Sequence, residues 1–102
     1  MKRVVALLLG AFVTVSNVSA KEDKAGYEDC VLEHVSGAEE ALAVNVITYA
    51  CHRLYIDNFM LSGKDEAYFS CLLEYLPASK SEQVTHKIRN ICYRRHLGLF
   101  EF

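Results

Sequence analysis

Four cysteines constrain this chain more than any other feature. They stand at positions 30, 51, 71 and 92, so both pairs have a spacing of 21 residues and a shift of 41 moves the first pair onto the second. An even number of cysteines in a short chain predicts a disulfide framework, which supplements the modest core of a small domain. We therefore expect Cys30, Cys51, Cys71 and Cys92 to be oxidised in pairs.

The same shift aligns further residues, which indicates an internal duplication. The identical pairs besides the cysteines are Tyr27 with Tyr68, Leu32 with Leu73, Glu33 with Glu74, Ile47 with Ile88 and Arg53 with Arg94. We call two residues counterparts when they stand 41 positions apart. Repeat 1 is predicted to span residues 27–55, and repeat 2 to span residues 68–96.

Apolar residues recur at helical spacing within each repeat, and the alternation typical of strands is absent. The pattern predicts helices at 25–35, 39–56, 65–76 and 80–97, joined by short links. Short links favour antiparallel neighbours. The predicted fold class is all-α, with four short helices forming two duplicated, disulfide-linked helical hairpins.

Polar residues are expected where these helices begin. Ser79 is the predicted N-cap of the last helix, because a serine oxygen can accept a hydrogen bond from a free N–H group of the first turn. The acidic pairs Glu39 with Glu40 and Asp65 with Glu66 stand at two other helix starts. There they complement the positive end of the helix dipole, which we favour over a role in acid and base catalysis.

The spacing alone leaves two disulfide pairings open. Joining Cys30 to Cys51 and Cys71 to Cys92 closes each hairpin. However, Gly37 is seven residues after Cys30 and fourteen before Cys51, a mismatch of about 10 Å along the two helices. The rival scheme joins Cys51 to Cys71 and Cys30 to Cys92. We favour pairing within the repeats, because a few extended residues at the turn can span the mismatch.

One stretch of the sequence resembles a known repeat. Tyr27-x-x-Cys30-Val31-Leu32-Glu33, followed by Gly37 and then Ala50-Cys51, is similar to the repeat of an uncharacterised family of small exported bacterial four-cysteine proteins. The second copy departs from this pattern, with Ala78 in place of the glycine and Ile91 before the last cysteine. The resemblance implies a helical, disulfide-linked fold and implies no activity.

The first twenty residues have the layout of a secretory signal peptide. Lys2 and Arg3 precede an apolar stretch from Val4 to Val15, and small residues lead to Ala20. The stretch is shorter than the roughly 20 apolar residues that a helix needs to cross a bilayer. We expect cleavage after Ala20, which leaves residues 21–102 as a single helical domain without a membrane span, in the periplasm or secreted.

Cysteine and histidine raise the question of a metal site. Cys30 and His34, and again Cys92 and His96, stand four residues apart on predicted helices, where both side chains can reach one ion. The duplication argues against this, because three histidines have tyrosine counterparts and such exchange is typical of packed aromatic positions. The three pairs are His34 with Tyr75, His52 with Tyr93 and His96 with Tyr55. We expect no metal and no cofactor.

Catalysis has no supporting motif in this sequence. It contains no Gly-x-Ser-x-Gly, no phosphate-binding glycine loop and no His-Glu-x-x-His. Cys51 and His52 are adjacent, so on a helix their side chains point apart. We expect no catalytic residue and no enzymatic activity.

Charge is distributed unevenly along the chain. Residues 21–61 carry three positive and eight negative side chains, whereas Lys80–His96 carries five positive and one negative. The overall acidic balance gives no reason to expect nucleic-acid binding. We hypothesise that Arg89, Arg94 and Arg95 contribute to a site for an acidic protein partner. The alternatives are a solvated basic face or an internal ion pair with the first repeat.

Arg95 occupies an unusual position in the predicted pattern. It continues an apolar stripe formed by Val84, Ile88 and Ile91. Burying an unpaired guanidinium is costly, so we expect Arg95 at the edge of the core or beside an acidic group. The apolar tail from Leu97 to Phe102 is expected to seal the bundle rather than to offer a docking strip.

These observations together predict a small exported protein that binds another protein in the cell envelope or outside the cell. The first alternative is a structural or acid- and stress-resistance role, chaperone-like, in which histidines respond to pH. The second is a metal carrier. The sequence does not determine the partner or the oligomeric state.

Overall fold

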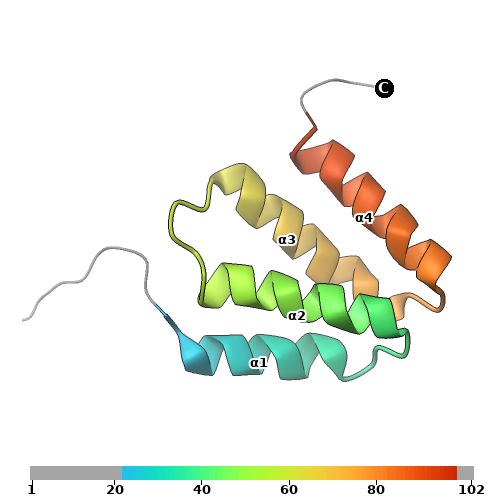
Figure 1. The fold of residues 1–102 in the computed structure, drawn as a ribbon, viewed down its shortest axis with the longest axis horizontal. Helices are drawn as coiled ribbons and strands as arrows, with labels where there is room; N and C mark the ends of the chain where they lie inside the picture. The colour runs from blue at the N-terminus through green and yellow to red at the C-terminus, as the bar shows by residue number, and fades with distance from the viewer. Residues whose placement is uncertain (1–21, 99–102) are drawn as a thin grey trace, which may run out of the picture.

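The computed structural model describes residues 22–98, and this part of the chain is helical and contains no strand. The helices are α1 (Lys24–Val35), α2 (Ala41–Tyr55), α3 (Gly63–Tyr75), the short 3-10 helix η2 (Leu76–Ala78) and α4 (Glu82–His96) (Figure 1). The all-α prediction is confirmed, and the four predicted helices have ends that differ from these by at most two residues. The predicted signal peptide and the tail residues 99–102 lie outside the described residues.

The starts of α2 and α3 have the acidic caps that the sequence predicts. The Glu40 carboxylate accepts hydrogen bonds from the N–H groups of Leu42 (3.0 Å) and Ala43 (2.9 Å). In α3, the N–H of Asp65 donates to Ser62 Oγ, and the N–H of Ser62 donates to Asp65 Oδ2, each at 3.1 Å. This reciprocal capping box begins α3 two residues earlier than the periodicity predicts.

The prediction that Ser79 caps the last helix is wrong. Ser81 is the N-cap of α4, and its Oγ accepts from the N–H of Val84 at 3.1 Å. Pro77 lies in η2, which extends the turn after α3 and carries Ser79 into the interior, where it is 1% exposed. Both serines can cap a helix, and the tertiary position of Ser79 decides between them.

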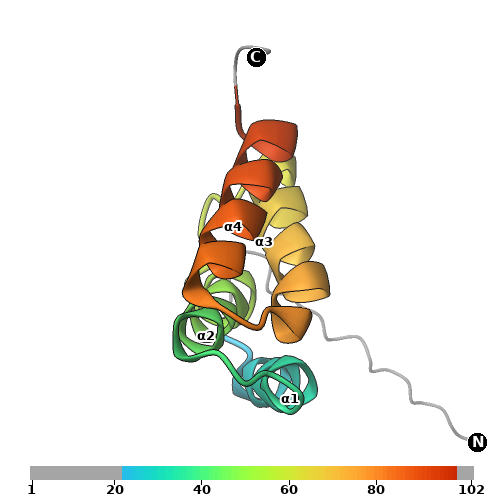
Figure 2. The same ribbon diagram turned by 90° about the vertical axis from the view of Figure 1, so that its right-hand side faces the viewer.

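The helices pack in the order in which they occur along the chain. α2 lies between α1 and α3, and α4 packs on the other side of α3, with its N-terminal part close to α2. The turned view shows α1 and α4 at opposite edges of the molecule (Figure 2). α2 and α3 are therefore the interior helices of the stack.

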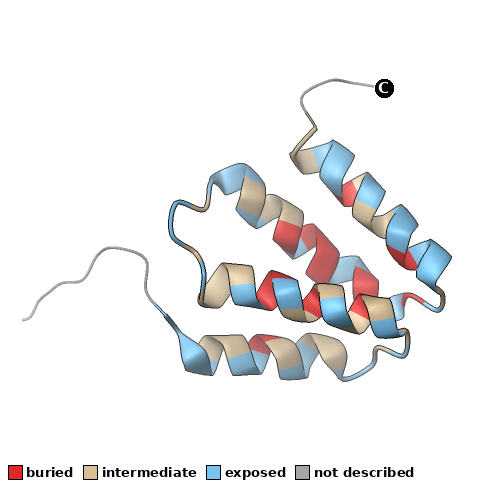
Figure 3. Cartoon of the chain, in the orientation of Figure 1, coloured by how far each residue is buried: buried red, intermediate tan, exposed pale blue. Residues whose placement is uncertain are grey.

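Burial follows this order. The buried hydrophobic residues form one core cluster, in which α2 and α3 contribute most members and α1 and α4 contribute one cysteine each. Figure 3 shows this burial along the ribbon, together with the buried Ser79 and Thr85. The core residues of the two interior helices are Ala43, Ile47, Ala50, Cys51, Phe69, Cys71, Leu72 and Leu73. The outward sides of α1 and α4 are consequently available to solvent or to a partner.

Two disulfides join the helices as the favoured pairing predicts. Cys30 of α1 is bonded to Cys51 of α2, and Cys71 of α3 to Cys92 of α4. Each bond spans 21 residues with a Cα–Cα distance of 5.8 Å. The predicted obstacle to this pairing is removed by the non-helical residues 36–40, which cover the unequal distances from the turn to the two cysteines.

A polar network fastens the N-terminus of α4 to that of α2. The hydroxyl of Thr85, which is fully buried, donates to Glu40 Oε1 at 2.5 Å. The hydroxyl of Ser79 lies 2.7 Å from that of Thr85 and donates to the carbonyl oxygen of Ser81 at 3.0 Å. The Thr85 bond is the main cause that holds the pKa of Glu40 below its ordinary value, and desolvation opposes it.

Candidate functional site

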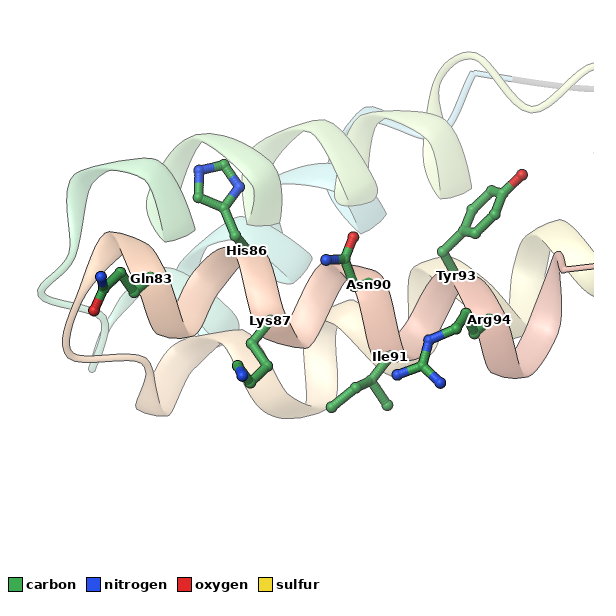
Figure 4. A pocket seen from close by; sticks show the side chains of 7 residues that line it. All are labelled: Gln83, His86, Lys87, Asn90, Ile91, Tyr93 and Arg94. Carbon is green, nitrogen blue, oxygen red and sulfur yellow. The ribbon is translucent and has the colours of Figure 1, made fainter. Parts of the chain in front are cut away.

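An open depression runs along the outer side of α4. It has a volume of about 850 Å³ and is open to solvent. Figure 4 shows His86, Asn90 and Tyr93 extending from one side of the helix, and Lys87 and Ile91 from the other. Its lining residues, which we call the α4 face, are Gln83, His86, Lys87, Asn90, Ile91, Tyr93 and Arg94.

The α4 face combines positive charge with amides and aromatic surface. Lys87 and Arg94 are exposed, and Tyr93 is 52% exposed. Two acidic side chains lie near the N-terminal end of the face: the carboxylate of Glu82 is 3.8 Å from His86 Nε2, and the charge of His86 helps to lower the pKa of Glu40. Arg94 has no carboxylate within 4.0 Å among residues 22–98. An acidic group on a partner can therefore reach the Arg94 guanidinium without displacing an ion pair of the described chain.

The three arginines proposed from the sequence do not line one cavity. Arg94 lies on the α4 face, whereas Arg95 lines a separate apolar pocket of about 180 Å³ beside the Cys71–Cys92 disulfide. Arg89 is half-buried and lines neither of them. Residues five or six apart on a helix point in different directions, which explains why Arg89 is separated from the other two.

Two expectations concerned the arginines: the position of Arg95 at the edge of the core, and an internal ion pair with the first repeat. Arg95 is exposed, so it lies at the edge of the core as expected. The ion pair that links the region of α4 to the first repeat involves Lys80 instead, whose Nζ lies 3.7 Å from Glu39 Oε1. Both side chains of that pair are mostly exposed, so it contributes little to stability.

Sequence reasoning missed three polar members of the α4 face. Gln83, His86 and Asn90 carry no motif of their own, and only their spacing along one side of a helix connects them with Lys87. A signal was nevertheless present. Their counterparts in α2 include Leu42 and Tyr49, so comparing the repeats residue by residue marks a face where apolar side chains have become polar.

One group of side chains in residues 22–98 has the composition of a metal site. Donor atoms of Cys30, His34 and Cys51 lie within 4.8 Å of one another. The two sulfurs are bonded to each other, and a disulfide is not the thiolate ligand that zinc requires. His34 Nδ1 lies 2.8 Å from the carbonyl oxygen of Cys30, to which it donates. A metal could use both cysteines only after reduction of the bond.

The exchange between histidine and tyrosine has a structural explanation at one position. The ring of His52 meets that of Tyr27 edge to face, with centroids 6.1 Å apart and an interplanar angle of 89°. Their counterparts Tyr93 and Tyr68 repeat this geometry at 6.3 Å and 89°. The same ring contact is thus made by either residue type, as expected for an aromatic packing position.

The described residues fit a protein that works outside the reducing cytoplasm. Both disulfides are consistent with an extracellular or periplasmic location. No helix within residues 22–98 has the length and hydropathy to span a membrane. The cysteine bonding agrees with the oxidising environment that the sequence predicts.

Comparison with known proteins gives one match. A family model described as "Four-cysteine protein VF_A0006-like" matches residues 8–96, a range that contains all four cysteines. No curated protein and no solved structure gives a significant match. Since the model covers most of the sequence, this chain belongs to the VF_A0006-like family of four-cysteine proteins.

Proposed function

We propose that this protein is an exported, non-enzymatic binding module whose α4 face docks an acidic protein partner. The observation that carries the proposal is the open depression of about 850 Å³ on α4, with Lys87 and Arg94 in its lining. The guanidinium of Arg94 can hold a carboxylate through two hydrogen bonds. Lys87 adds a flexible positive charge, and Tyr93 adds aromatic surface of the kind enriched in protein interfaces.

The scaffold of α4 favours such a role because it holds the face in one conformation. Cys92 ties the helix to α3, and Thr85 ties its N-terminal turn to Glu40 at the start of α2. Ser81 caps the helix. A face held in place before binding loses little conformational entropy when the partner arrives.

Long-range electrostatics supports an acidic rather than a basic partner. The last turn of α4 carries Arg94, Arg95 and His96, which produces a local positive field in a molecule of net charge −2. Oppositely charged proteins are steered toward such a patch, and salt weakens the steering.

Export through a cleaved signal peptide is part of the proposal. The layout of residues 1–20 and the requirement of both disulfides for an oxidising compartment support it. Mass spectrometry of the protein recovered from the cell envelope should give a chain that begins at Lys21. A chain that retains residues 1–20 contradicts the predicted cleavage.

The test of the binding role is affinity capture from an envelope extract with Arg94→Glu and a matched control. We expect Arg94→Glu to reduce capture of the wild-type partners by about 10-fold, because it reverses the central charge of the face. Lys64→Glu makes the same change in net charge on the exposed first turn of α3, outside the lining of the face, and should capture normally. Equal capture by wild type and Arg94→Glu contradicts the proposal.

A further inference from the structure

Part of the α4 face corresponds, position by position, to the side of α2 that α3 covers. In α2, the ring of Tyr49 lies 5.8 Å from that of Phe69 in α3, and the guanidinium of Arg53 lies 5.4 Å from the same ring. The counterparts of Tyr49 and Arg53 are Asn90 and Arg94, which both line the α4 depression. The depression is thus the counterpart of the α2 surface that α3 covers.

The α2 surface is covered by α3, whereas its counterpart on α4 is open to solvent within residues 22–98. Ala50 of α2 is 0% exposed. Its counterpart Ile91 is only partly buried and lies at the margin of the depression. Isoleucine is the larger and more apolar residue, so leaving it partly exposed forgoes more burial than alanine would.

The helix that corresponds to α3 is α1, and Glu28 and Leu32 on the matching side of α1 are exposed. A shallow apolar cavity of about 310 Å³ is lined there by residues that we call the α1 face: Tyr27, Glu28, Val31 and Leu32. Leu32 is 70% exposed, whereas its counterpart Leu73 is 8% exposed. The α1 face thus contains the counterparts of Phe69, Leu72 and Leu73, which are buried in α3.

The two free faces differ from the internal interface in complementary ways. Phe69, which contacts Tyr49 and Arg53, has Glu28 as its counterpart on α1. A carboxylate at this position would meet Asn90 and Arg94, which offer an amide and a guanidinium. An aromatic contact inside the chain is thereby replaced by a charge-assisted one between the free faces.

Side-chain size changes in the same complementary way. On α1, Val31 stands where α3 has the larger Leu72, while on α4, Ile91 stands where α2 has the smaller Ala50. Volume lost on one face is regained on the other, as close packing between the two faces requires.

From these observations we infer that a second copy of this chain docks its α1 face on the α4 face, repeating the packing of α3 on α2. The inference rests on the proposed binding role of the α4 face and names the acidic partner as the first repeat of another copy. Because the two faces differ, the contact is head to tail and leaves one free face at each end. Such a contact continues into longer oligomers unless it closes into a ring. A symmetric pairing of two α4 faces brings Arg94 and Lys87 against their own copies, which like-charge repulsion opposes.

The primary test is sedimentation of the purified, oxidised protein over a wide range of concentration. We expect wild type to form dimers and larger species that weaken as salt is raised. Glu28→Arg should weaken self-association about 10-fold or more, because it places like charges against Arg94. Glu33→Arg makes the same charge change on α1 outside the cavity lining, and should associate as wild type does. A wild-type chain that stays monomeric, or a Glu28→Arg variant that associates normally, overturns the inference.

Mixing two impaired variants tests the direction of the contact. Arg94→Glu alone should also lose self-association, whereas an equimolar mixture with Glu28→Arg should regain it. In the mixture, the intact α1 face of one variant meets the intact α4 face of the other, and the second contact has its charges exchanged. A mixture that remains as dissociated as the single variants overturns a head-to-tail contact. Unchanged helical circular dichroism of both variants excludes unfolding as the cause, since both replaced residues are exposed.

The self-docking inference and the binding role fail in different experiments. If wild type is monomeric while Arg94→Glu still loses capture from an envelope extract, the second copy is the wrong partner and the α4 face remains a binding site. If neither self-association nor capture responds to Arg94→Glu, both are wrong. If Glu28→Arg loses self-association but captures other proteins normally, the α1 face serves the second copy alone.

Discussion

Helices α2 and α4 are counterparts, but their places in the stack differ. α2 lies between α1 and α3, whereas α4 packs on α3 and leaves its outer side free. The fully buried residues Ala43, Ile47 and Ala50 of α2 have as counterparts Val84, which is 43% exposed, and the partly buried Ile88 and Ile91. The difference teaches that position in the stack, rather than the pattern of the unit, decides how much of a helix is buried, as in repeat proteins whose end units have one neighbour.

The largest expected effect is a difference in stability loss when the same isoleucine-to-alanine substitution is made in α2 and in α4. Ile47→Ala should lower the free energy of unfolding by about 4 kcal/mol, because it leaves a cavity between three helices. Ile88→Ala should cost about 2 kcal/mol, since its partly buried site already meets solvent or can collapse. Urea unfolding of both variants measures this. Equal losses would mean that α4 is as well covered as α2.

Replacing each disulfide measures a contribution to stability that we expect to be the same in both hairpins. Replacing Cys30 and Cys51 together by alanine, or Cys71 and Cys92 together, should each lower stability by about 3 kcal/mol, since both bonds close loops of the same length. Thermal unfolding of the two double variants tests this equality. A clearly larger loss for the first pair would show that packing around α2 adds to the effect of loop closure.

Thr85 tests the connection between the two repeats. Thr85→Val keeps the shape of the side chain but removes the hydroxyl that donates to Glu40 and contacts Ser79. It should lower the free energy of unfolding by about 2 kcal/mol. Thr48→Val is the matched control, because that hydroxyl bonds only the carbonyl of Val44 within α2. The control should cost less than about 1 kcal/mol. Similar losses in both variants would contradict a linking role for the network.

Acid should act on the same connection with a smaller effect. The Thr85 hydroxyl lowers the pKa of Glu40 in the folded chain, and the N–H groups of Leu42 and Ala43 add to it. A lowered folded pKa contributes stability above the unfolded value of about 4.3, and this contribution is lost as pH falls through the folded value. Stability should therefore decline below about pH 4, and less so in Glu40→Gln. Stability that is constant or rises in acid would favour the acid-resistance role instead.

Sequence periodicity was sufficient to predict the helices, whereas cysteine spacing left two disulfide pairings open, of which the structure has the favoured one. The apolar positions of α2 lie on one side of a helix wherever it packs, and the predicted duplication favours closing each hairpin with its own bond. The choice between Ser79 and Ser81 as cap was not predictable in this way, because it depends on the contact of Ser79 with Thr85. Helix starts are local, but competition between two suitable serines is decided by tertiary structure.

The candidate site was predicted only in part, for a related reason. The positive charge of the last helix is visible in the sequence, and Arg94 does line the depression. Separating it from Arg89 required knowing which sides of α4 are covered by other helices. That depends on packing order, which composition does not contain. Charge therefore indicated the helix, and the fold was needed to indicate the face.

The pairing of each cysteine with its neighbour in sequence also bears on how the bonds form. Four cysteines allow three pairings, and the one observed joins Cys30 to Cys51 and Cys71 to Cys92. In a chain that emerges into an oxidising compartment N-terminus first, Cys51 appears when Cys30 is the only available thiol. An oxidant that joins cysteines in order of appearance makes the native bonds directly, with no wrong bond to rearrange by slow thiol–disulfide exchange. The protein should therefore acquire its bonds from an oxidase alone, without a disulfide isomerase.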